Sequence, residues 1–519
     1  MKHSPLKITR IVLAILIFVP LLLFCCDFAH GLPRSFHALA HLQFTPALLS
    51  GSVIILVLLL LLTFLFGRIY CSVICPLGVL QDFLAKLNRG KKKRNNKRKR
   101  EYRYTKPYNI LRYSLLGLCI IFLIFGNITL LGWLDPYSNF GRIAVNIFRP
   151  VLVAGNNLIA WIAMQMHSYS FYHVTLHTVT VASFCFAFAA LLLVAVLSVW
   201  RGRLFCNTLC PVGSFFSLIS RFSLFRVKVD ESKCTHCGLC AKSCKAECID
   251  SKKGEIDHSR CVVCFNCLER CNKEHALHYT FAYSKPKSQS APAPEQVKGM
   301  NRRAFLATST ALAATLPLLP AWAQSKKEID PTKLTPITPP GSRSLKHFTE
   351  RCTACHLCVT HCPMQIIKPA GFNFGIEYAF KPHLVYYEMA FCNYECTVCS
   401  QICPNGAIER LTRDEKQTTQ IGIAQFEKSR CVVFVENTSC GACSEHCPVQ
   451  AVRMEPYGDT GLTLPHVYDE LCIGCGGCES ICPVRPVKAI NILANETHQT
   501  AIRPKEEKIE EVEELDFGF

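Results

Sequence analysis

The sequence predicts an α-helical membrane domain followed by two small α+β domains that are rich in cysteine. Half of the 519 residues are hydrophobic, one in ten is aromatic and the mean hydropathy is positive, so the composition is not that of an ordinary soluble protein. Four apolar segments of spanning length lie in the first 200 residues, and most of the 33 cysteines follow them in regularly spaced groups. The chain is long enough for three or more such domains.

Four segments have the length of about 20 apolar residues that a hydrocarbon core requires. They are residues 8–27, 47–66, 114–133 and 179–200. The stretch 151–166 is also apolar, but Gly155, Asn156 and Asn157 interrupt it. We therefore expect a four-span unit with an additional interfacial or half-span helix.

The basic residues predict the direction of these spans. Nine of the twelve residues from 89 to 100 are Lys or Arg, and such loops stay on the cytoplasmic side, next to anionic lipid. Basic residues also precede the first span and follow the fourth. Both ends of the four-span unit, residues 1–222, are thus predicted to be cytoplasmic. This location accounts for the net charge of +19 better than nucleic-acid binding does, because no nucleic-acid fold is visible.

The first block of cysteines contains two C-x2-C-x2-C-x3-C runs. This is the ligand run of bacterial two-cluster [4Fe–4S] ferredoxins, in which the fourth cysteine of one run ligates the cluster held by the other. The rule assigns one cluster to Cys234, Cys237, Cys240 and Cys271. It assigns the second cluster to Cys261, Cys264, Cys267 and Cys244.

The second block contains four further groups, all of which end in Cys-Pro. They are Cys352, Cys355, Cys358 and Cys362; Cys392, Cys396, Cys399 and Cys403; Cys431, Cys440, Cys443 and Cys447; and Cys472, Cys475, Cys478 and Cys482. By the same exchange, we expect the first and fourth groups to share ligands, so that Cys482 completes the first triad and Cys362 completes the fourth. Likewise, we expect Cys447 to complete the second triad and Cys403 to complete the third. Residues 223–283 and 345–500 are then ferredoxin-like α+β domains with two and four clusters.

Other cysteine chemistries fit this spacing less well. Zinc sites close with two pairs of ligands, whereas each run here supplies three cysteines on one tight loop and a distant fourth. The sequence Cys352-Thr-Ala-Cys355-His356 also matches the c-type haem attachment pattern, but the ferredoxin spacing continues directly through it. Disulfide frameworks are typical of short secreted chains. The spacing therefore favours iron–sulfur ligation.

A second repeat lies within the membrane domain. The element GRxxCxxxCPxG closes the second and fourth apolar segments, at residues 67–78 and 202–213. Residues four apart share one face of a helix, so each element could present two thiols together. If the two hairpins pack with approximate two-fold symmetry, a further cluster, a metal site or a set of redox thiols could form from Cys71, Cys75, Cys206 and Cys210. A packing role, with a turn fixed by Pro and Gly, is the alternative.

The segment between the two cysteine blocks has the parts of an export signal. A linker rich in Pro and Ser, residues 284–299, precedes Arg302 and Arg303, and an apolar run then ends in an A-x-A sequence before Gln324. Twin arginines indicate the export route for folded proteins. Residues 300–325 are thus predicted to be a signal or fifth span, cleaved or retained, that carries the second block outside. The alternative for residues 300–325 is a buried helix of a soluble domain. Residues 326–344 are expected to be a linker, and residues 501–519 an acidic tail.

Histidines gather in the two loops that are predicted to face outward. On a helix, the i,i+4 spacing of His37 with His41 and of His173 with His177 would let each pair converge. Because histidine titrates near neutrality, these side chains are candidates for a quinone site or for accepting quinol protons. The candidates are His30, His37, His41, His173 and His177. Interfacial hydrogen bonding is the alternative.

These motifs resemble two known families. Residues 1–280 are similar to the NapH/MauN-type membrane ferredoxins, which have four spans, two GRxxCxxxCP elements and a two-cluster domain. Residues 300–495 resemble the NapG/MauM-type exported ferredoxins, most specifically in Cys392-x3-Cys396, Cys431-x8-Cys440 and CIGCGGCESICPVRPVKAI. The chain looks like a natural fusion of two proteins that are usually separate. It departs from the pattern in that no Pro follows Cys244 or Cys271, and Cys248 is an additional cysteine.

The resemblance implies electron transfer through six [4Fe–4S] clusters, from membrane quinol to an exported oxidoreductase or cytochrome. It implies a multi-pass protein of the bacterial inner membrane, with residues 223–283 cytoplasmic and residues 345–519 periplasmic. A hydrocarbon core about 30 Å thick would then separate the two blocks, so a membrane carrier or an intermediate site is required. There are two alternatives. One is a maturation factor that reduces the metal site of a partner enzyme, and the other is a redox sensor. A chain of six clusters favours electron transfer over both.

Overall fold

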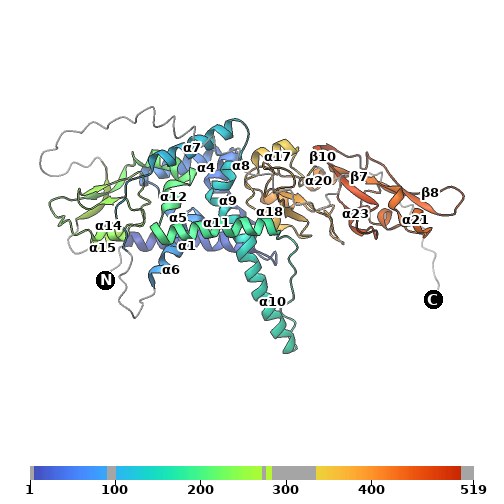
Figure 1. The fold of residues 1–519 in the computed structure, drawn as a ribbon, viewed down its shortest axis with the longest axis horizontal. Coiled ribbons are helices and arrows are strands. Elements are labelled where there is room, and N and C mark those ends of the chain that lie inside the picture. Colours follow the sequence, from blue (N-terminus) through green and yellow to red (C-terminus); the bar gives the residue numbers. More distant parts are fainter. Residues whose placement is uncertain (1–4, 91–100, 272–275, 283–334, 388, 504–519) are drawn as a thin grey trace, which may run out of the picture.

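The computed structural model describes residues 5–90, 101–271, 276–282, 335–387 and 389–503. Most of the polybasic loop, the linker, the twin-arginine segment and the acidic tail lie outside the described residues. Figure 1 shows an elongated molecule in which a central helical bundle separates two cysteine-rich domains, one at each end. We call these domain 1, residues 223–282, and domain 2, residues 335–503.

Two long apolar helices run along the bundle. They are α1 (Pro5–Cys26) and α11 (Val181–Arg201), with 22 and 21 residues, which is long enough to cross a hydrocarbon core. The Thr180 side chain caps α11 by accepting the backbone N–H of Ser183, and Gly202, with a φ of 66°, ends it. These helices agree with the first and fourth predicted spans.

The second and third predicted spans are shorter in the structure. In their place are α4 (Val53–Phe66) and α7 (Asn109–Ile124), with 14 and 16 residues. Glycines with positive φ, Gly51 and Gly126, interrupt the apolar segments. Beyond these breaks lie the short helices α3 (Phe44–Leu49) and α8 (Thr129–Leu134). Four complete spans therefore stay a prediction.

A third helix of spanning length occupies residues Pro136–Gln165. It consists of α9 (Pro136–Ile143), the π-helical turn η2 (Ala144–Phe148) and α10 (Arg149–Gln165). Asp135 caps its start, because its carboxylate accepts the N–H of Ser138 at 2.7 Å. Figure 1 shows α10 leaving the bundle across the direction of α11. That direction suits the interfacial helix expected over residues 151–166.

Each GRxxCxxxCP element forms two helices rather than one. The first contains α5 (Tyr70–Val73) and α6 (Pro76–Gly90), and the second contains α12 (Leu204–Thr208) and α13 (Pro211–Ser220). The expectation that both cysteines of an element share one helix face was therefore wrong. The proline after the second cysteine begins a new helix, since its fixed φ and missing N–H suit the first helical position.

Domain 1 is a small α+β unit with two antiparallel ribbons. β1 pairs with β4, and β2 pairs with β3. The bounds are β1 (Phe225–Val229), α14 (Leu239–Ser243), β2 (Ile249–Asp250), β3 (Glu255–Ile256), α15 (Asn266–Arg270) and β4 (Leu277–Phe281). Phe66 stacks on Phe225 with ring centroids 5.6 Å apart, and the Tyr279 hydroxyl donates to the Phe66 carbonyl at 3.1 Å. Domain 1 thus rests on the end of α4.

Domain 2 contains three two-stranded antiparallel sheets joined by short helices. Its strands pair as β5 with β6, β8 with β9, and β7 with β10. The bounds are α17 (Leu345–Arg351), α18 (Leu357–His361), β5 (Ile367–Pro369), β6 (Pro382–Leu384), α19 (Val398–Ile402), α20 (Arg413–Thr418), β7 (Thr419–Phe426), α21 (Val432–Glu436), α22 (Ala442–Glu445), β8 (Val452–Pro456), β9 (Thr463–Val467), α23 (Gly477–Ile481) and β10 (Ile490–Thr500). The Leu384 N–H donates to the carbonyl of Ile337. The packed domain therefore begins before residue 345, the boundary predicted from the sequence.

Candidate functional site

Two cavities lined by cysteine lie in domain 1. One is lined by Cys234, Cys237, Cys240 and Cys271. The other, of about 370 Å³, is lined by Cys244, Cys261, Cys264, Cys267 and the additional Cys248. These are the two sets that the exchange of fourth ligands predicts. Apolar side chains such as Val227 and Ile249 complete the second cavity, so it combines four candidate cysteine ligands with an apolar wall.

The ligand loops turn their backbone N–H groups toward the cysteine sulfurs. The sulfurs of Cys264, Cys355 and Cys475 each accept the N–H of the residue two positions later. The intervening residues, Phe265, His356 and Gly476, all have positive φ, from 58° to 80°. N–H donors to sulfur stabilise thiolate and tune the potential of a bound cluster.

Two cavities in domain 2 reveal how its groups exchange ligands. The second triad, Cys392, Cys396 and Cys399, shares a cavity with Cys362. The third triad, Cys431, Cys440 and Cys443, shares one with Cys482. Each has a volume of about 370 Å³, the same as the second cavity of domain 1.

The last cysteines of the second and third groups, Cys403 and Cys447, are located by the charges that act on neighbouring thiols. Burial is the main cause that raises the pKa of Cys355 to about 12, and the charge of Cys403 is among those that add to it. Burial likewise raises the pKa of Cys475 to about 12, with Cys447 adding to it. The first triad therefore lies beside Cys403, and the fourth triad lies beside Cys447.

The nested exchange expected for domain 2 was wrong. The first group exchanges its fourth cysteine with the second, and the third exchanges with the fourth, whereas we expected the first to pair with the fourth. Consecutive runs are joined by short connections and usually become spatial neighbours. Domain 2 thus repeats the two-run unit of domain 1 twice.

The residues present fit [4Fe–4S] clusters. Each set offers four cysteines, the ligand number that such clusters require. The thiolates around a four-iron cube lie further apart than the ligands of one ion, and no three His, Cys, Asp or Glu side chains in the described part of the chain converge as a site for a single metal ion.

The ligand exchange can be tested by combining substitutions. Cys403→Ala should remove about four iron atoms per chain, and adding Cys355→Ala should remove no more, because both cysteines belong to one site. Adding Cys440→Ala instead should roughly double the loss. Iron analysis of the purified chain measures this. The nested pairing predicts the opposite result, since it places Cys403 with the third triad.

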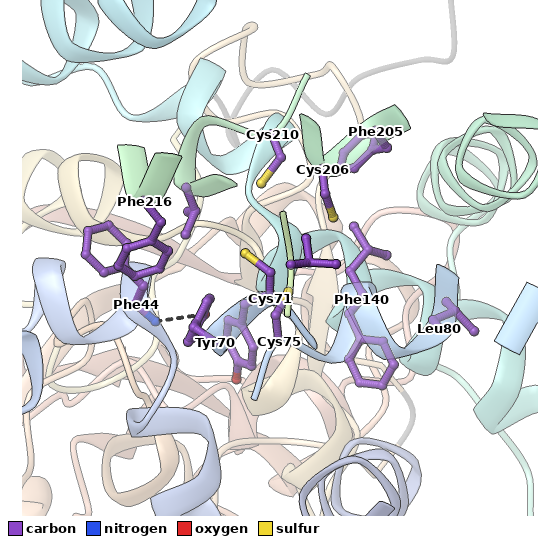
Figure 2. Close-up of a cluster of buried hydrophobic side chains, with 14 of the residues drawn as sticks. Phe44, Tyr70, Cys71, Cys75, Leu80, Phe140, Phe205, Cys206, Cys210 and Phe216 are labelled. Carbon is purple, nitrogen blue, oxygen red and sulfur yellow. Dashed lines mark hydrogen bonds between the residues drawn. The ribbon is translucent and has the colours of Figure 1, made fainter. Parts of the chain in front are cut away.

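The structure also brings together the four cysteines of the membrane repeat (Figure 2). Cys71, Cys75, Cys206 and Cys210 are buried, with 2–3% of their surfaces exposed. Cys75 and Cys210 each lie close enough to Cys71 and Cys206 for their charges to interact. Their surroundings include Tyr70 and the aromatic rings of Phe44 and Phe216.

Domain 2 docks on the bundle through its first ligand loop. Arg142 of α9 donates to the carbonyl of Thr353 at 3.4 Å, and Arg149 of α10 donates to the carbonyl of Thr360 at 3.2 Å. The Thr360 hydroxyl donates to the Cys25 carbonyl of α1 at 3.0 Å. Both arginines are 1% exposed. Our sequence reasoning missed this interface, although two arginines in an otherwise apolar helical segment were a signal for it.

Four of the five candidate histidines lie along this interface, in separate places. His37 and His41 share α2 (His37–His41), with ring centroids 5.4 Å apart. His30 lies 6.4 Å from the ring of His361. Residues 172–180 contain no helix, so the helical i,i+4 convergence expected for His173 and His177 was wrong. His177 lies beside Tyr387, and His173 is exposed.

Family models for iron–sulfur domains match both cysteine-rich domains and the membrane repeat. A model described as "4Fe-4S binding domain" matches residues 50–95 and 183–230, and a second with this description matches residues 227–250 and 345–368. A "4Fe-4S dicluster domain" model matches residues 438–486. The chain contains ferredoxin-type 4Fe–4S binding domains. Their matches cover parts of domain 1, domain 2 and both GRxxCxxxCP elements.

Curated relatives of these 4Fe–4S domains are ferredoxin-type proteins. The chain is 27% identical over 147 residues to the ferredoxin-type protein NapG of Escherichia coli K12, covering 27% of this chain and 62% of NapG. It is 29% identical over 145 residues to the methylamine utilization ferredoxin-type protein MauM of Methylobacillus flagellatus, covering 27% of this chain and 61% of MauM. It is 29% identical over 143 residues to E. coli NapF, covering 27% of this chain and 75% of NapF.

The chain thus spans less than two thirds of the length of NapG and MauM. No solved structure matches it. These likenesses support iron–sulfur electron transfer of the ferredoxin type.

Proposed function

We propose that this protein holds six [4Fe–4S] clusters and transfers electrons from membrane quinol to an exported oxidoreductase or cytochrome. The observation that carries the proposal is the position of the two cysteine-rich domains at opposite ends of the helical bundle (Figure 1). The 21 residues of α11 give a length of about 31 Å, close to the hydrocarbon thickness of about 30 Å. Domain 1 would face the cytoplasm and domain 2 the periplasm of the bacterial inner membrane.

When bound, [4Fe–4S] clusters supply reversible one-electron transfer. The protein's own residues hold them and adjust their surroundings. Lys381, which is 3% exposed, acts electrostatically on Cys352, and Arg142 acts on Cys352 and Cys355. Two buried cations beside one ligand set favour the negatively charged, thiolate-bound state of that site.

The proposed quinol site is α2, where the bundle meets domain 2. Arg410 of domain 2 lies 3.4 Å from Nε2 of His37. Burial, reinforced by the charges of His37 and Arg410, lowers the pKa of His41. The His41 Nε2 is buried without a hydrogen-bond partner among the described residues. A neutral imidazole nitrogen in this position can accept a hydrogen bond from a quinol hydroxyl.

Liposomes that contain only this protein and a quinol analogue test the function. We expect anaerobic addition of the quinol to bleach the cluster absorbance and to produce the EPR signals of reduced clusters. His41→Phe should slow this reduction on the order of 10²-fold, the usual range for losing a proton-transfer group. His173→Phe, at the exposed histidine, is the matched control. Clusters that dithionite reduces but quinol does not would contradict the proposal.

Protease added to sealed, oriented vesicles tests the placement of the two domains. We expect cleavage from the outer side to reach domain 2 and to spare domain 1. Loss of only domain 1 from that side would reverse the proposed topology.

A further inference from the structure

We propose that Cys71, Cys75, Cys206 and Cys210 bind one further iron–sulfur cluster, shared between the two GRxxCxxxCP elements. The 4Fe–4S binding domain model matches each element separately, but each element has only the two cysteines of its C-x3-C spacing. A four-cysteine ligand set exists only when the two elements combine. The inference therefore goes beyond the six clusters of the proposed function.

The two elements hold each other by a reciprocal pair of hydrogen bonds. Arg68 of the first element donates to the carbonyl of Cys206 at 3.1 Å, and Arg203 of the second donates to the carbonyl of Cys71 at 2.7 Å. The glycine that ends each element leaves room for this contact. An added Cβ at Gly78 would lie 2.7 Å from the Arg203 guanidinium, and one at Gly213 would lie 2.8 Å from that of Arg68. The repeat thus forms one two-fold unit.

Each of the four sulfurs lies beside a hydrogen-bond donor, and the donors follow the same two-fold relation. Arg68 donates to the Cys71 sulfur at 3.7 Å, and the Arg203 guanidinium lies beside the Cys206 sulfur. The sulfurs of Cys75 and Cys210 accept the backbone N–H three residues later, at Gly78 and Gly213. Donors to sulfur are what a set of cluster-bound thiolates requires. Packing alone does not need a donor at every sulfur.

The site also carries buried positive charge that a thiolate cluster would balance. Arg68 and Arg203 are 0% and 1% exposed. Arg203 shares the carboxylate of Asp82 with Arg10 and Lys245, and its second terminal nitrogen has no hydrogen-bond partner among the described residues. Buried cations are costly unless they are paired. Four thiolates around an iron–sulfur core carry the net negative charge that would pair with them.

The position of the site suits an intermediate between the two cysteine-rich domains. On one side, the backbone N–H of Arg203 donates to the Lys245 carbonyl at 3.0 Å, beside the domain 1 ligand Cys244. On the other side, Tyr70 lies next to Cys71, Cys75 and Asp135. Asp135 in turn lies near Tyr137, which hydrogen-bonds the domain 2 ligand Cys355. One electron would enter the site from one neighbouring cluster and one would leave to the next, with no bond made or broken.

Iron analysis and EPR of the purified full-length chain test the proposal. We expect about 28 iron atoms per chain if the site holds a [4Fe–4S] cluster, or about 26 for a [2Fe–2S] cluster, against about 24 for six clusters alone. Cys75→Ser and Cys210→Ser should each lose the same two to four atoms and the same EPR signal. Cys119→Ser, at a buried cysteine of α7, is the matched control and should lose neither.

Two results would overturn the proposal. One is a folded Cys75→Ser or Cys210→Ser chain, with the other cluster signals intact, that keeps the iron content of the wild type. The other is a disulfide among the four cysteines in the protein as isolated, found by anaerobic alkylation and mass spectrometry. If both variants fail to fold, the wild-type iron content decides, because a value of about 24 leaves no iron for this site. These results do not depend on quinol oxidation, so they can fail separately from the proposed function.

Discussion

Replacing Asp82 with Asn is expected to lower the free energy of unfolding by about 3–5 kcal/mol, the cost of removing one partner from a buried charge pair. The Asp82 carboxylate contacts Arg10 at 3.1 Å, Arg203 at 2.9 Å and Lys245 at 3.3 Å. These cations come from α1, from the second GRxxCxxxCP element and from domain 1. The substitution leaves three cations without their shared carboxylate, so it should loosen both the bundle and its contact with domain 1.

The pH dependence of this effect follows from the pKa of Asp82. Burial alone would raise that pKa, but Arg203, Lys245 and Arg10 outweigh it and hold the pKa well below its usual range. The carboxylate therefore contributes stability above the ordinary Asp pKa of about 3.9, and this contribution is lost as the pH falls below that value. The free energies of unfolding of the wild type and of Asp82→Asn, measured with denaturant, should show their full difference at pH 7. That difference should shrink in acid.

Glu101→Gln provides the matched control for Asp82→Asn. Glu101 forms an ion pair with Lys242 at 3.0 Å, but both side chains are about half exposed. Exposed pairs contribute about 0–1 kcal/mol, so this variant should unfold almost as the wild type does. An equally small effect of Asp82→Asn would contradict the assignment of Asp82 as the shared anion of the three elements.

The ligand sets of domain 1 could be predicted from the sequence because the spacing of the cysteines is itself the chemical requirement. Three cysteines on one tight loop cannot complete a four-ligand site, so a distant fourth is needed and the paired run supplies it. In domain 2, four similar runs allow several pairings, and spacing does not distinguish them. The structure decides the order, because cavities join Cys362 to the second triad and Cys482 to the third, and Cys403 and Cys447 lie beside the first and fourth triads.

The membrane domain was harder to predict because hydropathy does not register local breaks in a helix. Gly51 and Gly126 adopt positive φ within otherwise apolar segments, and Pro76 begins a new helix directly after Cys75. Arginines that pair with backbone carbonyls were equally hidden. Arg68 and Arg203 could be seen in the repeat, but their reciprocal bonds depend on how the two hairpins pack.

Replacing Gly141 with Ala is expected to release domain 2 from the bundle without altering its ligands. An added Cβ at Gly141 would overlap the carbonyl oxygen of Cys355 and lie 3.2 Å from its carbonyl carbon. The loop cannot withdraw freely, because Thr353 and His356 on either side of Cys355 contact Arg142 and Asn146. Inserting a methyl group into packed structure costs about 1–3 kcal/mol, and about 1.4 kcal/mol changes the docking equilibrium tenfold.

Two other glycines make a graded comparison with Gly141→Ala. A Cβ at Gly132 would lie 3.3 Å from the Thr353 carbonyl oxygen, so Gly132→Ala should have a smaller effect. A Cβ at Gly155 on α10 would meet nothing within 4 Å, and Ala there should be neutral or stabilising, because Ala favours a helix by about 1 kcal/mol over Gly. All three substitutions make the same chemical change, so differences among them report the space at each site.

Hydrogen exchange and electron transfer between the domains should follow the same order. Amide exchange over residues 352–362 should rise most in Gly141→Ala, and the rate at which electrons pass between domain 1 and domain 2 should fall with it, while the iron content of the chain stays unchanged. Wild-type behaviour of Gly141→Ala would contradict the close approach of α9 to the first ligand loop. Unchanged iron with slower transfer would instead show that the docked contact, and not the clusters alone, carries electrons across the bundle.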